Sequence, residues 1–127
     1  YKRQTLIDAG YTVVAAPITL DAAGEGLLNT NADTIAGEAA KALAPFFDVT
    51  LVYCFEKKGV LRDENDDESV IPSIDRPMFE ALVADGTVQG GMIPKLENAF
   101  EAISTGVKEV VITRADAILS GGTRIVR

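Results

Sequence analysis

The sequence predicts an α/β fold in which helices cover both faces of a sheet. Three observations favour this class. β-rich apolar runs alternate with helical segments of about 10–15 residues, turn signals separate the two, and 127 residues are enough for one domain with a buried core. No internal repeat, low-complexity tract or linker divides the chain. We therefore expect a single structural unit over residues 1–127.

The first half of the chain is predicted to hold two strands and one helix. Residues 11–16 form a short β-rich run that ends at Pro17, which is typical of a buried strand. Residues 27–28 are expected to form a brief return strand. Residues 31–44 are rich in Ala with few helix breakers, so we expect a helix with Asn31 as its N-cap.

The second half continues the same alternation of strands and helices. The helix after the Gly90-Gly91 pair is the clearest, because Met92, Leu96 and Phe100 recur at helical spacing. Cys54 lies in an apolar run and is predicted to be an inert core residue. In chain order we expect a strand at 49–55, a hairpin joining 60–61 to 70–71, helices at 77–85 and 92–105, and strands at 107–112 and 123–126.

The composition argues against several classes of function. Nineteen acidic against twelve basic residues give a net charge of −7, so we expect no nucleic-acid or membrane partner. The sequence has no His and one Cys, which removes the usual zinc ligand and any internal disulfide. No apolar run approaches the roughly 18 residues that cross a bilayer. We expect a reduced, cytoplasmic compartment and no metal site.

The Gly90-Gly91 pair and Lys95 form the first candidate site. Glycines allow a ligand to approach the backbone closely, and the free amides at the start of the following helix can bind an anion. Lys95 falls in the first turn, where its charge opposes the helix dipole unless a phosphate is bound. A plain turn with a solvated lysine is the alternative, and the sequence leaves both open.

Asn29 and Asp33 form the second candidate site, at a junction between a loop and a helix. Four residues apart, both can face one cleft, and Asp33 could orient lysines through charge-assisted hydrogen bonds. Ordinary helix capping is the alternative. Glu56, at a strand end, could accept a hydrogen bond from a ribose hydroxyl or lie in a solvated turn. The acidic run 63–68 lacks the ligand spacing of a calcium loop, so we expect a solvated hairpin tip.

Two long motifs in these regions resemble a known family. Residues 29–37 (Asn-Thr-Asn-Ala-Asp-Thr-Ile-Ala-Gly) and 85–95 (Asp-Gly-Thr-Val-Gln-Gly-Gly-Met-Ile-Pro-Lys) are similar to the C-terminal half of the acetylglutamate kinases, within the amino acid kinase family. Residues 122–125 are similar to the closing strand of that family. The resemblance implies a three-layer α/β sandwich with a mainly parallel central sheet, like that of carbamate kinase, of which this chain is the C-terminal lobe.

The resemblance also implies an activity and roles for individual residues. ATP would phosphorylate the γ-carboxylate of N-acetylglutamate or another N-acylglutamate in arginine biosynthesis, with Mg²⁺ carried on the ATP phosphates. Asn29 would contact the acylglutamate, Asp33 would hold the catalytic lysines, and Lys95 would bind the transferring phosphoryl group. The nucleotide-binding residues would be Glu56, Gly90, Gly91, Met92 and Lys95.

The sequence departs from the family pattern in three places. Residues 55–58 (Phe-Glu-Lys-Lys) replace the commoner Thr/Ser-Asp-Val sequence. The segment 113–121 is short, so the last helix is expected to be reduced or lost. The N-terminal acylglutamate lobe, with its glycine-rich loop and catalytic lysine, is not present in this chain. We therefore expect the segment alone to be inactive and the full-length enzyme to be a homo-oligomer.

Two other functions remain open at the level of sequence. Another amino acid kinase, such as one similar to glutamate 5-kinase, would share the same nucleotide-binding half. A non-catalytic nucleotide-binding regulatory module would keep the lobe without the reaction. The substrate of the complete enzyme would distinguish the first alternative, and substitution of Asp33 or Lys95 would distinguish the second.

Overall fold

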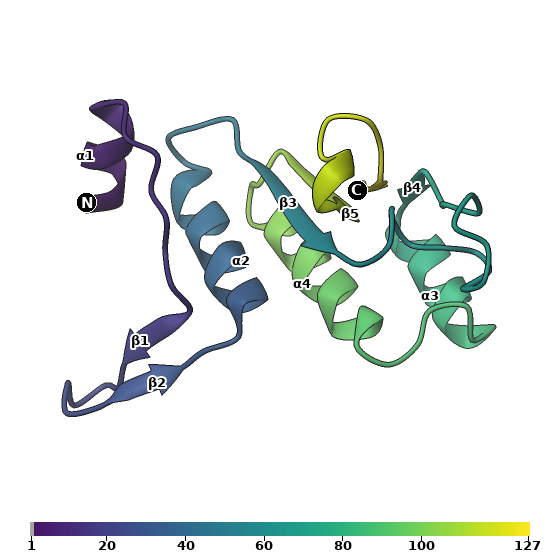
Figure 1. The fold of residues 1–127 in the computed structure, drawn as a ribbon, viewed down its shortest axis with the longest axis horizontal. Coiled ribbons are helices and arrows are strands. Elements are labelled where there is room, and N and C mark those ends of the chain that lie inside the picture. Colours follow the sequence, from purple (N-terminus) through teal and green to yellow (C-terminus); the bar gives the residue numbers. More distant parts are fainter. Residues whose placement is uncertain (1) are drawn as a thin grey trace.

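A four-stranded mixed sheet in the order β3-β5-β6-β4 forms the centre of the computed structural model, which describes residues 2–127 (Figure 1). β3 (Thr50–Phe55) and β5 (Glu109–Arg114) pair in parallel along their full lengths. β4 (Ser73–Ile74) pairs in parallel with β6 (Thr123–Ile125), whereas β5 and β6 are antiparallel. The predicted α/β class with a mostly parallel sheet is therefore confirmed.

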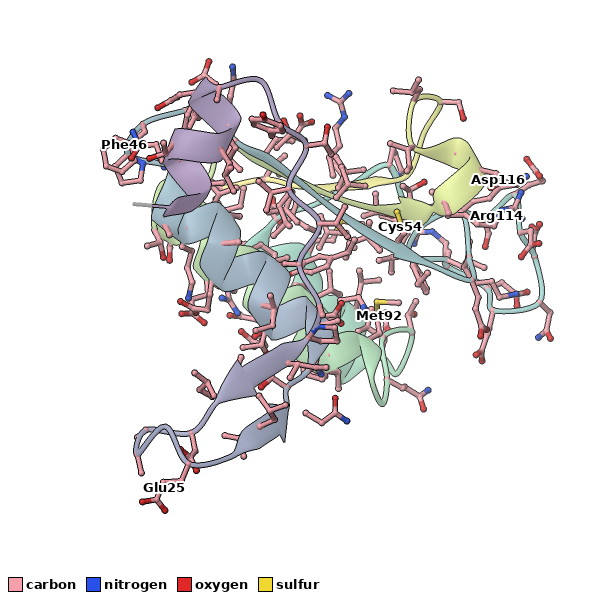
Figure 2. All side chains as sticks on the ribbon, turned by 60° about the vertical axis from the view of Figure 1, so that its left-hand side comes forward. Glu25, Phe46, Cys54, Met92, Arg114 and Asp116 are labelled. Atoms are coloured by element: carbon pink, nitrogen blue, oxygen red, sulfur yellow. The ribbon has the colours of Figure 1, made fainter. Side chains whose placement is uncertain are left out.

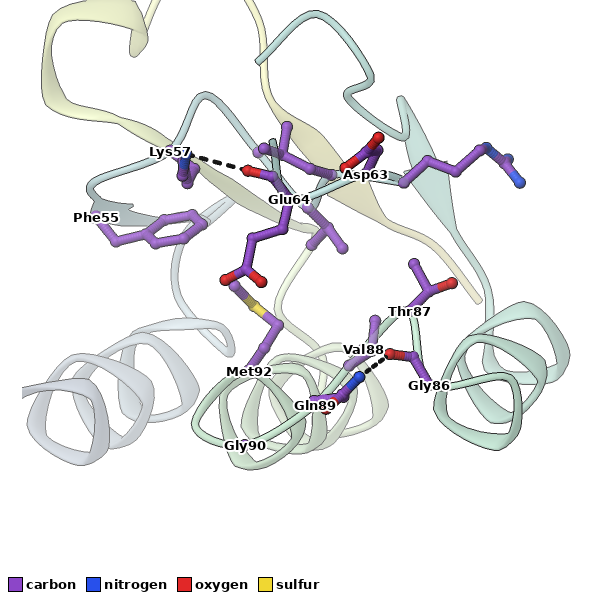
Figure 3. A pocket seen from close by; sticks show the side chains of 14 residues that line it. Phe55, Lys57, Asp63, Glu64, Gly86, Thr87, Val88, Gln89, Gly90 and Met92 are labelled. Carbon is purple, nitrogen blue, oxygen red and sulfur yellow. Dashed lines mark hydrogen bonds between the residues drawn. The ribbon is translucent and has the colours of Figure 1, made fainter. Parts of the chain in front are cut away.

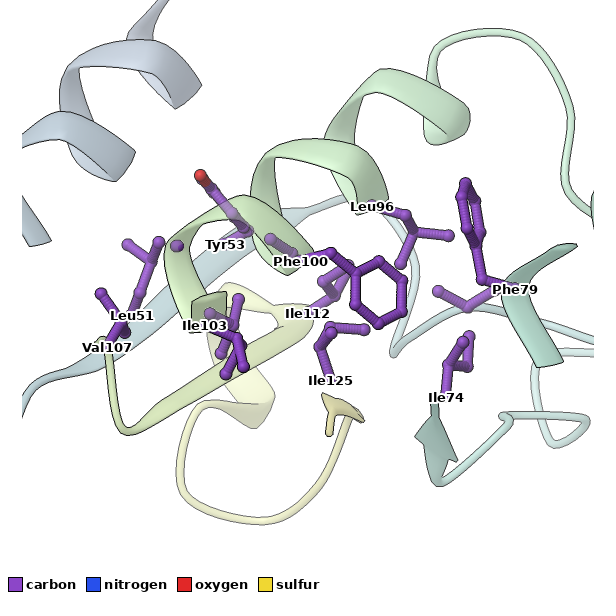
Figure 4. Packing of buried hydrophobic residues seen from close by; sticks show 14 of the residues in the cluster. Leu51, Tyr53, Ile74, Phe79, Leu96, Phe100, Ile103, Val107, Ile112 and Ile125 are labelled. Atoms are coloured by element: carbon purple, nitrogen blue, oxygen red, sulfur yellow. The ribbon is translucent and has the colours of Figure 1, made fainter. Parts of the chain in front are cut away.

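Three helices pack against one face of this sheet. α2 (Ala32–Leu43) lies beside β3 and α4 (Met92–Ser104), and α3 (Arg76–Ala84) lies on the far side of α4 (Figure 1). Between helices and strands is one apolar cluster (Figure 4), in which alternate strand residues face the buried side of α4. Its members include Leu51, Tyr53, Ile74, Phe79, Leu96, Phe100, Ile103, Val107, Val110, Ile112 and Ile125.

The opposite face of the sheet is less covered within residues 2–127. Cys54 is exposed, and Val52 and Val111 are half-buried, because strand residues alternate between the two faces. The prediction that Cys54 is a core residue is therefore wrong: an apolar run does not reveal which face each residue takes. The short segment after β5 contains only a 3₁₀ turn, η1 (Ala115–Ala117), which agrees with the expected reduction of the last helix.

Residues 2–30 form an N-terminal arm that precedes the sheet unit (residues 32–127). The arm consists of α1 (Lys2–Asp8), an extended segment, and a hairpin of β1 (Ile18–Leu20) and β2 (Leu27–Asn29). Figure 2 shows Glu25 at the tip of this hairpin, far from Cys54 on the sheet. The expected return strand is part of β2, whereas the sequence signals for α1 and β1 were missed.

The predicted strand at residues 11–16 does not form. The segment is outside every helix and strand, and Tyr11 and Val14 are 66% and 91% exposed. A strand requires a neighbour to pair its backbone amides and carbonyls, and no described strand pairs with this segment. The prediction of a buried strand is therefore wrong for the chain as it stands.

The remaining elements agree with the sequence to within a few residues. The Asn31 side chain caps α2 by accepting from the amide of Asp33 at 2.8 Å, as predicted. The hairpin over residues 60–71 is present as a single bridge between Leu61 and Val70. Its acidic tip is exposed, as expected, and Lys57 forms an ion pair with Asp67 there at 3.1 Å. The two-residue strand β4 was not predicted.

Candidate functional site

A pocket of about 800 Å³ opens between the loop after β3 and the turn before α4 (Figure 3). The first of these carries the candidate Glu56 and the second the Gly90-Gly91 pair, and ligands of open α/β sheets collect beyond the carboxyl ends of the strands. Its lining combines apolar, charged and glycine residues. They are Phe55, Lys57, Gly59, Val60, Leu61, Arg62, Asp63, Glu64, Gly86, Thr87, Val88, Gln89, Gly90 and Met92.

The Gly90-Gly91 turn forms one rim of the pocket at the N-terminus of α4. Gly90 adopts φ +53°, a conformation that residues with a Cβ rarely adopt, and an added Cβ at Gly91 would meet no atom within 4 Å. No side chain caps α4, and its first turn carries no acidic residue. The positive end of the helix dipole therefore faces the pocket rim, which suits a bound anion.

Asp33 and Lys95 form an ion pair that joins the N-terminal ends of two helices. The Lys95 ammonium donates to Asp33 Oδ2 at 2.6 Å, and the two side chains are 16% and 34% exposed. Asp33 lies in the first turn of α2, where the helix dipole favours a carboxylate. Lys95 lies in the first turn of α4, where the dipole opposes its charge. The carboxylate from α2 thus compensates a cation that α4 alone disfavours.

The structure separates the remaining candidates into those at the pocket and those beside it. Two of the candidates, Gly90 and Met92, line the pocket. Glu56 is exposed and lies outside the lining, although its neighbours Phe55 and Lys57 are within it. The other candidates, Asn29, Asp33, Gly91 and Lys95, are not lining residues, and Asn29 is exposed at the end of β2.

Several residues that line the pocket are not among the candidate site residues predicted from the sequence. Figure 3 shows the Phe55 ring and the Glu64 carboxylate directed into the pocket, on the side opposite the Gly90 turn. Phe55 could have been found as the last residue of a strand whose carboxyl end was already of interest. Glu64 could not, because its direction depends on the conformation of an acidic loop that looks solvated along its whole length.

Local hydrogen bonds hold the turn that directly precedes Gly90, on the same rim of the pocket, in shape. The amide of Thr87 donates to Asp85 Oδ1 at 2.9 Å, and bonding to the backbone and hydroxyl of Thr87 lowers the pKa of the Asp85 carboxyl. The Gln89 side chain donates to the carbonyl of Gly86, which closes the same turn. The rim that presents Gly90 is therefore a bonded turn rather than a free loop.

Tyr53 lies beneath the ion pair, on the helix-facing side of β3. It is 2% exposed, and its hydroxyl donates to the backbone carbonyl of Asp33 at 3.3 Å. Burial, together with the nearby negative charge of Asp33, raises the pKa of the Tyr53 phenol. The phenol is thus held in its neutral form, able to donate to α2.

Metal-binding and membrane features were also sought in the described part of the chain. Within residues 2–127, no three or more His, Cys, Asp or Glu side chains are grouped so that they could hold a metal ion. None of the helices in that range is long and apolar enough to cross a membrane.

Curated proteins similar to this chain include acetylglutamate kinases from several bacteria. The enzyme of Bacteroides thetaiotaomicron is 70% identical over 121 residues, which are 94% of this chain and 47% of that protein. The enzyme of Parabacteroides distasonis is 65% identical over 122 residues, 95% of this chain and 48% of that protein. The chain thus spans about half the length of the curated relatives it matches.

Solved structures share the fold. The protein smu.665 from Streptococcus mutans superposes with a TM-score of 0.79 at 30% identity, over 99% of this chain and 48% of that one. A carbamate kinase from Giardia lamblia superposes with a TM-score of 0.72 at 21% identity, over 99% of this chain and 48% of that one. The model of the amino acid kinase family matches residues 2–114. The chain therefore belongs to the amino acid kinase family.

Proposed function

We propose that this chain is the C-terminal, nucleotide-binding half of an enzyme that phosphorylates the γ-carboxylate of N-acetylglutamate, or of another N-acylglutamate, with ATP. The enzyme would act in arginine biosynthesis in the cytoplasm. The observation that carries the proposal is the Asp33–Lys95 ion pair beside the pocket of the Gly90-Gly91 turn. The 65–70% identity to acetylglutamate kinases over almost the whole chain supports the choice of reaction.

The chemistry needs positioned positive charge more than it needs a base. A γ-carboxylate is already ionised at neutral pH, so its oxygen attacks the γ-phosphorus of ATP without losing a proton. A bond from the carboxylate oxygen to phosphorus forms, the bond from phosphorus to the β,γ-bridging oxygen breaks, and ADP leaves with the electron pair. Lys95 would stabilise the charge on the transferring phosphoryl oxygens, and Asp33 would fix the direction of that lysine.

The other candidate residues have subordinate roles in this proposal. Gly90, Gly91 and Met92 would accept the nucleotide against the α4 N-terminus, and Asn29 would contact the acylglutamate. Glu56 would approach the nucleotide only if it turned toward the pocket whose lining it now adjoins. Within residues 2–127 no three or more His, Cys, Asp or Glu side chains are grouped for a metal ion. In this proposal Mg²⁺ enters on the ATP phosphates, which bind it in most kinases.

The N-terminal arm supports the assignment of this chain to half of an enzyme. Val14, Leu20 and Leu27 of this arm are 91%, 65% and 74% exposed, and the β-rich pattern of residues 11–16 suits a buried strand. Apolar surface of this extent is usually covered in a stable protein. We infer that the acylglutamate-binding half covers it in the full-length enzyme, which would be a homo-oligomer, and that the 127 residues alone bind nucleotide weakly and do not turn over.

A chimeric enzyme tests the proposal directly. The matching region of the Bacteroides thetaiotaomicron acetylglutamate kinase is replaced by this chain, and ADP release is measured with N-acetylglutamate, N-succinylglutamate and glutamate. We expect turnover with an N-acylglutamate and none with glutamate. Activity with glutamate alone would favour an enzyme similar to glutamate 5-kinase, and an inactive but folded chimera would contradict the proposal.

Two substitutions in the chimera test the roles of the ion pair. Lys95→Ala and Asp33→Ala should each lower kcat by about 100-fold or more, the usual loss when a charge that stabilises the transition state is removed. Lys108→Ala is the matched control, because Lys108 forms an ion pair with Asp48 at 2.8 Å on an exposed surface away from the pocket. Full turnover in both site variants would contradict the catalytic roles assigned to Asp33 and Lys95.

A further inference from the structure

The Lys95 ammonium faces two aromatic rings as well as the Asp33 carboxylate. It lies 5.3 Å from the centroid of the Tyr53 ring and 6.0 Å from that of the Phe55 ring. The face of an aromatic ring carries partial negative charge and attracts a cation within about 6 Å. The ammonium therefore has an anion on one side and two ring faces on another.

Strand β3 presents both rings to the lysine because they are two residues apart. Residues i and i+2 of a strand share a face, so Tyr53 and Phe55 both face the helices, whereas Cys54 between them faces the open side. A glycine on α2 provides the space for the first ring: a Cβ on Gly37 would lie 3.2 Å from the Tyr53 hydroxyl. The strand, α2 and α4 thus meet at one point.

The two rings differ in what else they contact. Tyr53 is almost fully buried and is tied to the backbone of Asp33, so it links the strand to the anion of the ion pair. Phe55 is half-buried and lines the pocket, so one ring borders both the pocket and the lysine. A lysine side chain has four rotatable carbons, and a single carboxylate leaves much of its freedom. Rings on a second side restrict the ammonium to one position.

We propose that Tyr53 and Phe55 are positioning residues for Lys95, holding its ammonium beside the pocket in the orientation used for phosphoryl transfer. This inference rests on the proposed function, since it assigns a purpose to the position of the lysine. The rings touch neither reacting atom. They act through Lys95, and their removal therefore lowers the rate of the chemical step rather than the affinity for the acylglutamate.

Kinetics of the chimera separate this role from a structural one. Tyr53→Leu and Phe55→Leu should each lower kcat about 2- to 30-fold, the range expected for loss of one cation–π contact, with KM for N-acetylglutamate changed less than about twofold. Tyr53→Phe keeps the ring and loses only the hydroxyl bond to Asp33, so it should lower kcat clearly less than Tyr53→Leu does. Phe79→Leu, which removes a ring from the core 5.5 Å from Phe100, is the matched control and should keep kcat. Unchanged kcat in both Leu variants, or an equal loss in Phe79→Leu, would overturn the inference.

A second measurement does not depend on turnover. Ring currents shift the NMR signals of protons held over an aromatic face, so the Lys95 ε-CH₂ signal of the folded chimera should lie upfield of those of the solvated lysines. Phe55→Leu and Tyr53→Leu should each move it back, and Tyr53→Phe should not. An inactive chimera that shows these shifts rejects the proposed reaction while the placement of Lys95 by the rings stands. A Lys95 signal that none of the variants moves rejects the placement.

Discussion

The sheet unit and the N-terminal arm have similar apolar patterns, but their apolar side chains are buried in the sheet unit and exposed in the arm. In the sheet unit, Leu96, Val110 and Ile112 are completely buried between α4 and the sheet. In the arm, Tyr11 and Val14 remain exposed although they lie in a run that reads equally well as a strand. The difference is the presence of a neighbour. β3 has β5 beside it and packs against α2, whereas residues 11–16 pair with none of the strands that the structure describes.

The comparison shows that an apolar run is a requirement for burial and not a sufficient cause of it. Burying one large apolar side chain stabilises a fold by about 1.5–3 kcal/mol, but only when other elements supply the surface. Substitutions should therefore cost more stability in the sheet unit than in the arm.

Truncation of a core side chain should affect the sheet unit most. Leu96 is 0% exposed at the centre of the cluster, so Leu96→Ala should lower the free energy of unfolding by about 2–5 kcal/mol. The matched change in the arm, Leu20→Ala, removes the same atoms from a side chain that is 65% exposed and should cost less than about 0.5 kcal/mol. Urea unfolding followed by circular dichroism measures both. Equal losses would mean that the arm is packed.

A charge introduced into the arm should destabilise the chimera more than the 127-residue chain. Val14→Asp should change the free energy of unfolding of the 127-residue chain by less than about 0.5 kcal/mol, because the side chain is 91% exposed. In the chimera the same substitution should cost about 2 kcal/mol or more, since a covered carboxylate without a partner is poorly solvated. Thermal unfolding of the two proteins gives the contrast. A chimera as tolerant as the chain would contradict coverage of the arm.

A glycine in the loop after β3 should reveal how tightly the sheet unit is packed. A Cβ on Gly59 would lie 2.7 Å from Val70 Cγ1 and 2.8 Å from Thr123 Oγ1. Gly59→Ala should therefore lower the free energy of unfolding by about 1–3 kcal/mol. Gly121→Ala is the control, because a Cβ there meets no atom within 4 Å, and it should be neutral or slightly stabilising. Similar losses of stability in Gly59→Ala and Gly121→Ala would show that the backbone freedom of glycine, and not the space around Gly59, sets the cost of the substitution.

The smallest effect concerns the Tyr53 phenol at high pH. Burial raises the pKa of Tyr53 above its ordinary value of 10.0, so the folded state holds the proton more tightly than the unfolded state. This contribution to stability is complete below pH 10 and is lost as the pH rises through the raised pKa. Above pH 10, Tyr53→Phe should therefore lose less Tm per pH unit than the wild type, while the two profiles run parallel below pH 9. Parallel profiles throughout would contradict the role of burial.

The sequence by itself determined most of the sheet unit. α2, β3, α3, α4 and β6 lie within a few residues of their predicted bounds, because each depends on local signals: the Asn31 cap, the helical spacing of Leu96 and Phe100, and the glycines that end α3 and α4. It also identified Gly90 and Met92 of the pocket and both partners of the ion pair. These candidate residues lie in two contiguous motifs, residues 29–37 and 85–95, which can be recognised directly in the sequence.

The tertiary structure alone decided which surfaces meet. It left residues 11–16 unpaired, turned Cys54 outward and Tyr53 inward from the same strand, and placed both rings of β3 against Lys95, some forty residues later in the chain. It also directed Glu64 into the pocket and left Glu56 outside it. Strand pairing and the choice of sheet face depend on segments distant in the sequence. No single run of residues therefore specifies which strands pair or which face a side chain takes. Both are set by the packing of the whole molecule.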